Sequence, residues 1–116
     1  MIRTEKFQIT SRGFNDCIDL TRKIRDILKG VKSCTVHVFA PNLCAIFVLP
    51  DEFEKEFLQN LRFPKSPTRD FIKASGSNSS VTLAVIGGEI IQKGRIVLVD
   101  FENRTDVKEI VVQFEE

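Results

Sequence analysis

The sequence predicts an α+β fold: an antiparallel or mixed β-sheet with two main helices. Two observations support this class. β-forming stretches follow one another in runs instead of alternating singly with helices, and only two segments carry apolar residues at helical spacing. The chain has 116 residues, of which 42% are hydrophobic and 28% charged. These values are usual for globular proteins, and we expect one domain over residues 1–116.

The first elements are two strands and a helix. Apolar and polar residues alternate over Thr4–Thr10, which predicts a strand with one wet face. Cys17–Leu20 is a short second strand. Apolar residues then recur at helical spacing over Arg22–Lys29, where Thr21 is the expected N-cap and Gly30 the expected C′ residue.

The middle of the chain predicts two more strands and a second helix. Ser33–Ala40 and Leu43–Leu49 are strongly β-forming, and Pro41 lies between them because it cannot donate to a ladder. Leu43–Leu49 is apolar on both faces, so we expect it to be central in the sheet. Asp51 is the expected N-cap of the second helix, whose apolar stripe is Phe53, Phe57, Leu58 and Leu61.

The last third predicts four strands, after a mobile loop over Ala74–Ser80. Gly87-Gly88 separates two β runs and predicts a two-residue hairpin, because both turn positions accept positive φ. The four strands are Val81–Ile86, Glu89–Gln92, Arg95–Phe101 and Val107–Phe114. Much of 81–101 is apolar on both faces, so we expect part of it to be buried against another copy of the chain.

Charge and cysteine usage exclude several classes of protein. The net charge is +1 and the cations are scattered, which argues against nucleic-acid binding. No apolar run approaches the roughly 20 residues of a membrane span, and Met1–Lys6 lacks the character of a signal peptide. Cys17, Cys34 and Cys44 form no C-x-x-C pair. These features predict a cytoplasmic chain with reduced, mostly buried thiols.

Cysteine and histidine chemistry has weak support in the sequence. Cys34 and His37 are three apart on one predicted strand, so their side chains point to opposite faces and a metal site is not expected. Cys44 and His37 could pair as nucleophile and base if their strands met suitably. The favoured interpretation is that Cys44 is a thiol in the core and that His37 is a strand residue partly exposed at an edge.

Two further features could carry polar chemistry. The loop Ser75–Ser80 has hydroxyls and a glycine whose backbone could form an anion-binding nest, although flexible-loop composition explains it equally well. Asp100 interrupts an apolar strand and needs a partner or water if it is buried. Arg12, Arg69 and Arg95 are candidate partners, but a surface position at a strand end is favoured.

The order of elements and several local phrases resemble the YjbQ family, the secondary thiamine-phosphate synthase proteins. The similar stretches are FQITSRGFNDCIDLTRKIRDIL, VHVFAPNLCAIFVL, IKASGSNSSVTLAVIGGEI and RIVLVDFENRTDVKEIVVQF, which together span nearly the whole chain. The resemblance implies a small α+β protein that assembles as a homotrimer. It also implies histidine-bearing pockets proposed to hold a metal or phosphate.

The histidines of the family are missing from the matching positions. Its His-Thr-Thr-Ala phrase falls on Asn42-Leu43-Cys44-Ala45, and the histidine of its Ala-His-Leu-Lys phrase is replaced by Phe71. Its Leu-Gly-Thr-Trp-Gln phrase falls near residues 90–94 without Trp or Gln in register. We therefore expect no catalytic residue, no metal and no cofactor. The remaining pocket, which could hold a small anion such as phosphate, would be lined by Asn42, Cys44, Phe71, Lys73 and the loop with Ser75 and Ser77.

Three functional hypotheses follow. The first is a non-catalytic YjbQ-like binding or structural module that forms a homotrimer. The alternative is an enzyme related to thiamine-phosphate synthase with an altered active site, in which Cys44 is the nucleophile and Asn42 or a neighbouring subunit's Lys73 assists. A third is a module that binds partners through an exposed β edge.

Overall fold

The computed structural model describes residues 2–13, 16–41, 43–53, 79–102 and 104–115. Two antiparallel sheets form the described part of the chain. The five-stranded sheet has the order β1-β8-β3-β5-β6, and its strands are Ile2–Ser11, Asp106–Glu115, Cys34–Phe39, Ser80–Ile86 and Glu89–Ile90. The three-stranded sheet has the order β2-β7-β4, and its strands are Asp16–Asp19, Arg95–Asp100 and Cys44–Leu49.

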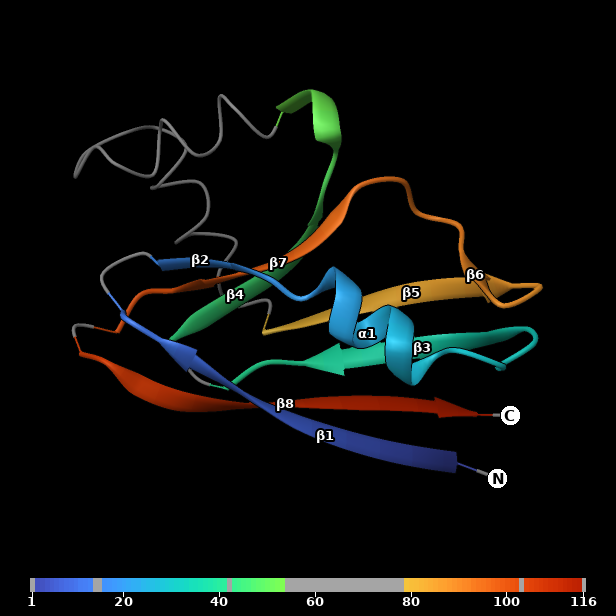
Figure 1. The fold of residues 1–116 in the computed structure, drawn as a ribbon, viewed down its shortest axis with the longest axis horizontal. Coiled ribbons are helices and arrows are strands. Elements are labelled where there is room, and N and C mark those ends of the chain that lie inside the picture. Colours follow the sequence, from blue (N-terminus) through green and yellow to red (C-terminus); the bar gives the residue numbers. More distant parts are fainter. Residues whose placement is uncertain (1, 14–15, 42, 54–78, 103, 116) are drawn as a thin grey trace.

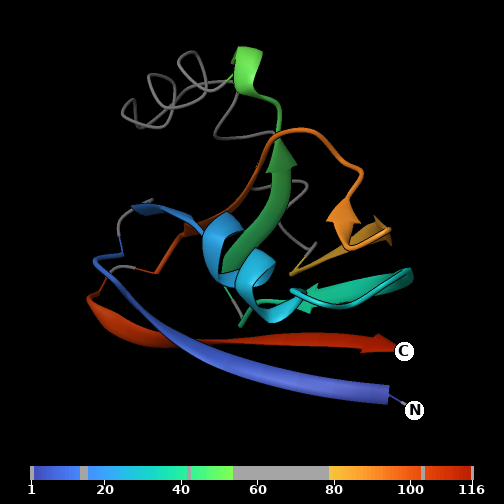
Figure 2. The same ribbon diagram turned by 45° about the vertical axis from the view of Figure 1, so that its right-hand side comes forward.

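One face of the five-stranded sheet is covered by the rest of the described chain. Helix α1, Thr21–Ile27, and the three-stranded sheet lie on the same side of it (Figures 1 and 2). The main core fills the space between them: Ile24 of α1, Val36 of β3 and Leu98 of β7 are completely buried there. These layers explain the alternation of buried and exposed residues along β1, β3, β5 and β8.

The opposite face of the five-stranded sheet, called here the outer face, has no described helix or strand over it (Figure 2). Alternate residues of β1, β8, β3 and β5 line it. Phe39 is 41% exposed and Val107 is 53% exposed on this face. Its only charged residues on these four strands are Lys6, Glu109 and Glu115, and the first two lie 4.0 Å apart as an ion pair.

All eight predicted strands are confirmed, with boundaries that move by at most two residues. The hairpin at Gly87-Gly88 is also confirmed, since both glycines have positive φ and Ile86 pairs with Glu89. Leu43–Leu49 was expected to be central, which is wrong for the sheet formed by the described residues: β4 is at its edge and β7 is the middle strand. Both strands are nevertheless buried on two faces, one in the main core and one in a smaller cluster that joins Ala45 and Leu49 of β4 to Val97 and Val99 of β7.

Thr21 does not cap the first helix. It is the first helical residue, and its Oγ1 instead accepts a hydrogen bond of 2.8 Å from the backbone N–H of Ile96. Asp19 accepts the N–H of Thr21 at 2.9 Å. Because the N–H of Ile96 is buried, it needs an acceptor, and the Thr21 hydroxyl supplies it. This tertiary requirement outweighs the local pattern that predicts Thr21 as the N-cap.

The second predicted helix is not confirmed. Among the described residues, α1 is the one α-helix, and Asp51–Phe53 form a 3-10 turn, η1. The remaining residues of the expected helix, 54–61, and the expected loop 74–78 lie outside the described part of the chain. No helix in the described part is long and apolar enough to cross a membrane.

Candidate functional site

Strand ends from both sheets meet at one end of the molecule, away from the two termini (Figure 1). Asp100, the last residue of β7, pairs across the ladder with Asp16 of β2 on one side and Cys44 of β4 on the other. Ser11 ends β1 and pairs with Asp106 at the start of β8. The topology therefore brings residues far apart in sequence to one polar centre.

Asp100 is the hub of this centre, which we call the Asp100 cluster: Ser11, Cys44, Asp100, Glu102 and Lys108. The carboxylate is completely buried. Its Oδ2 accepts the Ser11 hydroxyl at 2.5 Å, and its Oδ1 accepts the Glu102 backbone N–H at 3.0 Å. The Cys44 thiol lies 3.7 Å from Oδ1, and Lys108 Nζ lies 3.9 Å from Oδ2.

The favoured surface position of Asp100 is therefore wrong, and its partners are not the predicted arginines. Arg12 pairs with Asp16 at 3.9 Å and Arg95 with Asp19 at 3.5 Å, whereas Arg69 lies outside the described residues. The sequence did carry a signal for the true partner. Strand alternation in β8 places Lys108 on the same side as Ile110 and Val112, which makes it an inward-facing cation.

Lys108 balances the acidic groups of the cluster. Its side chain is 6% exposed, it is hydrogen-bonded to Glu102, and it lies 4.0 Å from Asp106. Burial by itself would lower the pKa of Lys108, but the hydrogen bond to Glu102 and the field of Asp100 outweigh it, so the pKa is raised. Lys108 is therefore a charged ammonium at neutral pH.

Cys44 is a poor nucleophile in this setting. Its side chain is buried, and burial together with the negative charge of Asp100 raises the pKa of the thiol to about 12. A thiol with this pKa is protonated at neutral pH, whereas the thiolate is the reactive form. His37 is not its partner: the imidazole Nδ1 lies 3.2 Å from Thr82 Oγ1 on the outer face.

The turn before β4 is exposed and conformationally unusual. Leu43 has φ +65° and its side chain is 62% exposed. Positive φ is uncommon for a bulky residue, and such strain clusters at ligand-binding and switch positions. The carbonyl of Leu43 accepts the N–H of Phe101 at 2.9 Å, which ties this turn to the strand end that carries Asp100.

Of the six predicted ligand-binding residues, only Cys44 lies within the described part of the chain. Asn42, Phe71, Lys73, Ser75 and Ser77 lie outside it. Sequence reasoning missed Ser11, Glu102 and Lys108. Among the residues that the structure does describe, no three histidine, cysteine, aspartate or glutamate side chains are arranged to hold a metal ion.

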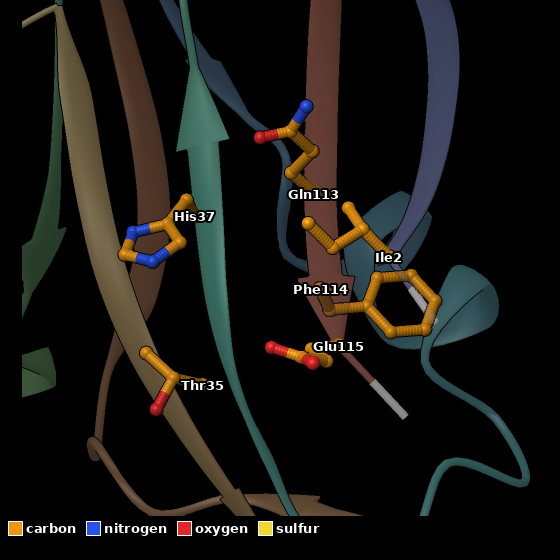
Figure 3. A pocket seen from close by; sticks show the side chains of 6 residues that line it. All are labelled: Ile2, Thr35, His37, Gln113, Phe114 and Glu115. Atoms are coloured by element: carbon orange, nitrogen blue, oxygen red, sulfur yellow. The ribbon is translucent and has the colours of Figure 1, made fainter.

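His37 borders a separate hollow on the outer face (Figure 3). The hollow has a volume of about 520 Å³ and is lined by Ile2, Thr35, His37, Gln113, Phe114 and Glu115. Figure 3 shows the imidazole turned toward β5, away from Gln113 and Glu115 on β8. This agrees with its contact to Thr82, so the hollow lacks a carboxylate–imidazole pair for acid–base chemistry.

Comparison with known proteins identifies the fold. No family model matches the sequence, and no curated protein matches it. A structural-genomics target from C. acetobutylicum matches with a TM-score of 0.75 and 20% identity, covering 98% of this chain and 100% of that one. An uncharacterised conserved protein of the YjbQ family from Clostridium acetobutylicum matches with a TM-score of 0.72 and 17% identity, over 96% and 99%.

A third similar structure is a "YbjQ-like" protein of unknown function from Sulfolobus solfataricus P2. Its TM-score is 0.68 and its identity 12%, over 98% of both chains. At these identities the likeness establishes the fold. The predicted resemblance to YjbQ proteins is thereby confirmed at the level of architecture: the chain has a YjbQ-like fold.

Proposed function

We propose that this chain is a non-catalytic member of the YjbQ family: a cytoplasmic binding or structural module that assembles as a homotrimer. A small anion such as phosphate is the proposed ligand, held at the turn of Asn42 and Leu43. Cys17, Cys34 and Cys44 are not joined in disulfides, which is usual for proteins of a reducing compartment.

The main support for a non-catalytic role is that the carboxylate of Asp100 already has its full set of hydrogen-bond and ion-pair partners. Both carboxylate oxygens are engaged by groups of the chain itself, namely the hydroxyl of Ser11, the backbone N–H of Glu102, the thiol of Cys44 and the ammonium of Lys108. A general base must be able to reach a proton of the substrate. A buried carboxylate with four internal partners stabilises the fold instead, by joining β1 and β8 to β4 and β7.

The exposed turn supports the binding half. Leu43 has a strained backbone and an exposed side chain, and it follows Asn42, where the resemblance to YjbQ proteins implies a family site. Lys73 and the hydroxyls of Ser75 and Ser77 would supply the positive charge and the hydrogen-bond donors for an anion.

The outer face supports self-association. It is poor in charge and exposes Phe39 and Val107, and depletion of charge is the compositional mark of an interface core. Strands rise about 3.3 Å per residue and lie about 4.8 Å apart, so the face covers roughly 500 Å². Each copy would contribute about this area to an interface, which is the lower limit for a specific one.

Sedimentation velocity tests the assembly, with Phe39→Lys as the disruptive variant and Ile91→Lys as its matched control. Ile91 is 53% exposed and lies outside the four strands that line the outer face. We expect the native chain and the Ile91 variant to sediment as trimers and the Phe39 variant as a monomer. A native chain that stays monomeric at every concentration would refute the trimer.

Thiol labelling tests the non-catalytic half. We expect iodoacetamide at neutral pH to modify Cys44 more slowly than the half-exposed Cys17 and Cys34, and to modify all three equally in urea. Rapid and selective modification of native Cys44 would instead support the alternative, an enzyme with an altered active site. That alternative needs a thiolate, which the raised pKa of Cys44 disfavours.

A further inference from the structure

A wide groove lies at the opposite end of β4 and β7 from the Asp100 cluster. It has a volume of about 890 Å³, within the size of small-molecule sites. Helix α1, the 3-10 turn η1 and the segment between β6 and β7 form its walls. Leu49, which pairs with Arg95, ends β4 here, whereas Cys44 pairs with Asp100 at the other end. A β4 of six residues separates the two ends by roughly 17 Å.

Three cations of this groove have no side-chain partner among the described residues. Arg22 and Arg25 are three apart on the exposed side of α1, which places them on one helix face. Lys93 lines the groove from the segment before β7. Within the described part of the chain, none of the three makes an ion pair or a side-chain hydrogen bond. Their donors are therefore available to a ligand.

A fourth donor faces the same space. Gln92 accepts the backbone N–H of Ala84 through Oε1 at 3.1 Å, which fixes the orientation of its side-chain amide. The amide NH₂ then remains to donate. Gly94 also lines the groove, and its backbone lies so close to the Leu49 carbonyl that a side chain would not fit. This close approach holds the segment with Gln92 and Lys93 against the end of β4.

Three acids also line the groove, and one of them is already engaged. Asp19 accepts the Thr21 N–H at 2.9 Å and pairs with Arg95 at 3.5 Å. Asp26 and Asp51 make no ion pair within the described residues. The groove thus holds three cations and an amide donor, against two carboxylates that make no ion pair within the described residues.

We propose that this groove binds a phosphate monoester of a small hydroxylated molecule. Arg22, Arg25 and Lys93 would hold the phosphate, because guanidinium groups match its oxygens bidentately and the lysine adds a point charge. Asp26 and Asp51 would accept hydrogen bonds from hydroxyl groups on the rest of the ligand. This site is separate from the anion site proposed at the Asn42 turn.

Titration of the full chain with β-glycerophosphate, followed by ¹⁵N–¹H NMR, tests the proposal. We expect saturable shifts in α1 and in the segment before β7, with a Kd on the order of 1 mM or tighter. Arg22→Gln combined with Arg25→Gln should weaken binding at least about tenfold, since each lost charge-assisted contact is worth about that much. Lys93→Gln should weaken it by a smaller factor.

A matched double variant, Lys29→Gln with Lys32→Gln, removes the same charge from exposed sites that do not line the groove. It should bind as the native chain does. Equal loss in both double variants would refute the proposal, because net charge alone would explain the binding. Absence of saturable shifts, or inorganic phosphate binding as tightly as the monoester, would also refute it.

Lys73→Gln separates this site from the one at the Asn42 turn. Unchanged binding of β-glycerophosphate in that variant supports the groove, whatever becomes of the turn. Binding lost only in the Lys73 variant overturns the groove and supports the turn. The two proposals therefore fail separately.

Discussion

Replacing Asp100 by alanine is the strongest test of the claim that its cluster is structural. The substitution removes the acceptor for the Ser11 hydroxyl and for the Glu102 N–H, and it leaves the thiol of Cys44 without a partner. Lys108 stays buried but keeps Glu102 and Asp106 beside it. The loss is therefore that of a buried polar network with its ammonium still partly compensated.

The magnitude follows from these contacts. Breaking a buried ion pair by removing one partner costs about 3–5 kcal/mol. Because two acids remain near Lys108, we expect Asp100→Ala to lower the free energy of unfolding by about 3 kcal/mol. An unfolding entropy of about 2.1 cal/mol/K per residue gives about 0.24 kcal/mol/K for 116 residues. The melting temperature should then fall by about 12 °C. Asp100→Asn keeps an acceptor for the Glu102 N–H and should cost about half as much.

Urea unfolding at fixed protein concentration measures this loss, because the proposed self-association would make stability depend on concentration. Asp26→Ala and Asp26→Asn are the controls, since Asp26 is an exposed acid without an ion pair in the described residues. They should stay within about 0.5 kcal/mol of the native chain. An Asp100→Ala variant that also unfolds within that range would refute the structural role of the cluster.

Two further predictions concern the same end of the molecule. Stability should fall as the pH rises above 9, because the unfolded chain loses the Cys44 proton near its ordinary pKa of 9.0 while the fold keeps it up to about 12. The loss is about 1 kcal/mol at pH 10, and Cys44→Ala should remove that part of the pH dependence in urea titrations. Gly13→Ala should destabilise the chain by more than about 2 kcal/mol, because φ is +70° and the new Cβ would lie 2.5 Å from the Glu102 carbonyl. Gly30→Ala has φ +87° but open space around it, so it should cost only about 1 kcal/mol; equal losses in the two variants would contradict the steric reasoning.

The sequence predicts the strands and the hairpin because these depend on local patterns. Alternation of apolar and polar residues is sufficient to predict strands such as β1 and β8, and the two adjacent glycines are sufficient to predict the hairpin. Thr21 shows where local rules fail, since its hydroxyl serves a donor 75 residues away in β7. The middle position of β7 is also a property of tertiary pairing, which periodicity does not encode.

The candidate site was predicted less well, for a related reason. Asp100 was recognised as an acid in an apolar strand, yet its partners come from the ends of strands that pair only in the folded sheets. Candidate arginines were nominated by charge, whereas the actual cation, Lys108, is identified by strand parity. Charge and position in the alternation must be considered together to find a buried ion pair from sequence.

The arrangement of the strand ends separates stability from function. Asp100, Ser11 and Lys108 form the buried inner layer of the Asp100 cluster, and their polar groups are already engaged by contacts within the chain. Exchange of partners with a ligand would leave a buried charge unpaired, at a cost of several kcal/mol that a small ligand could not offset. Binding must therefore use groups outside this layer. The exposed turn at Leu43 and the cations of the groove meet that condition, and the length of β4 keeps the two places apart.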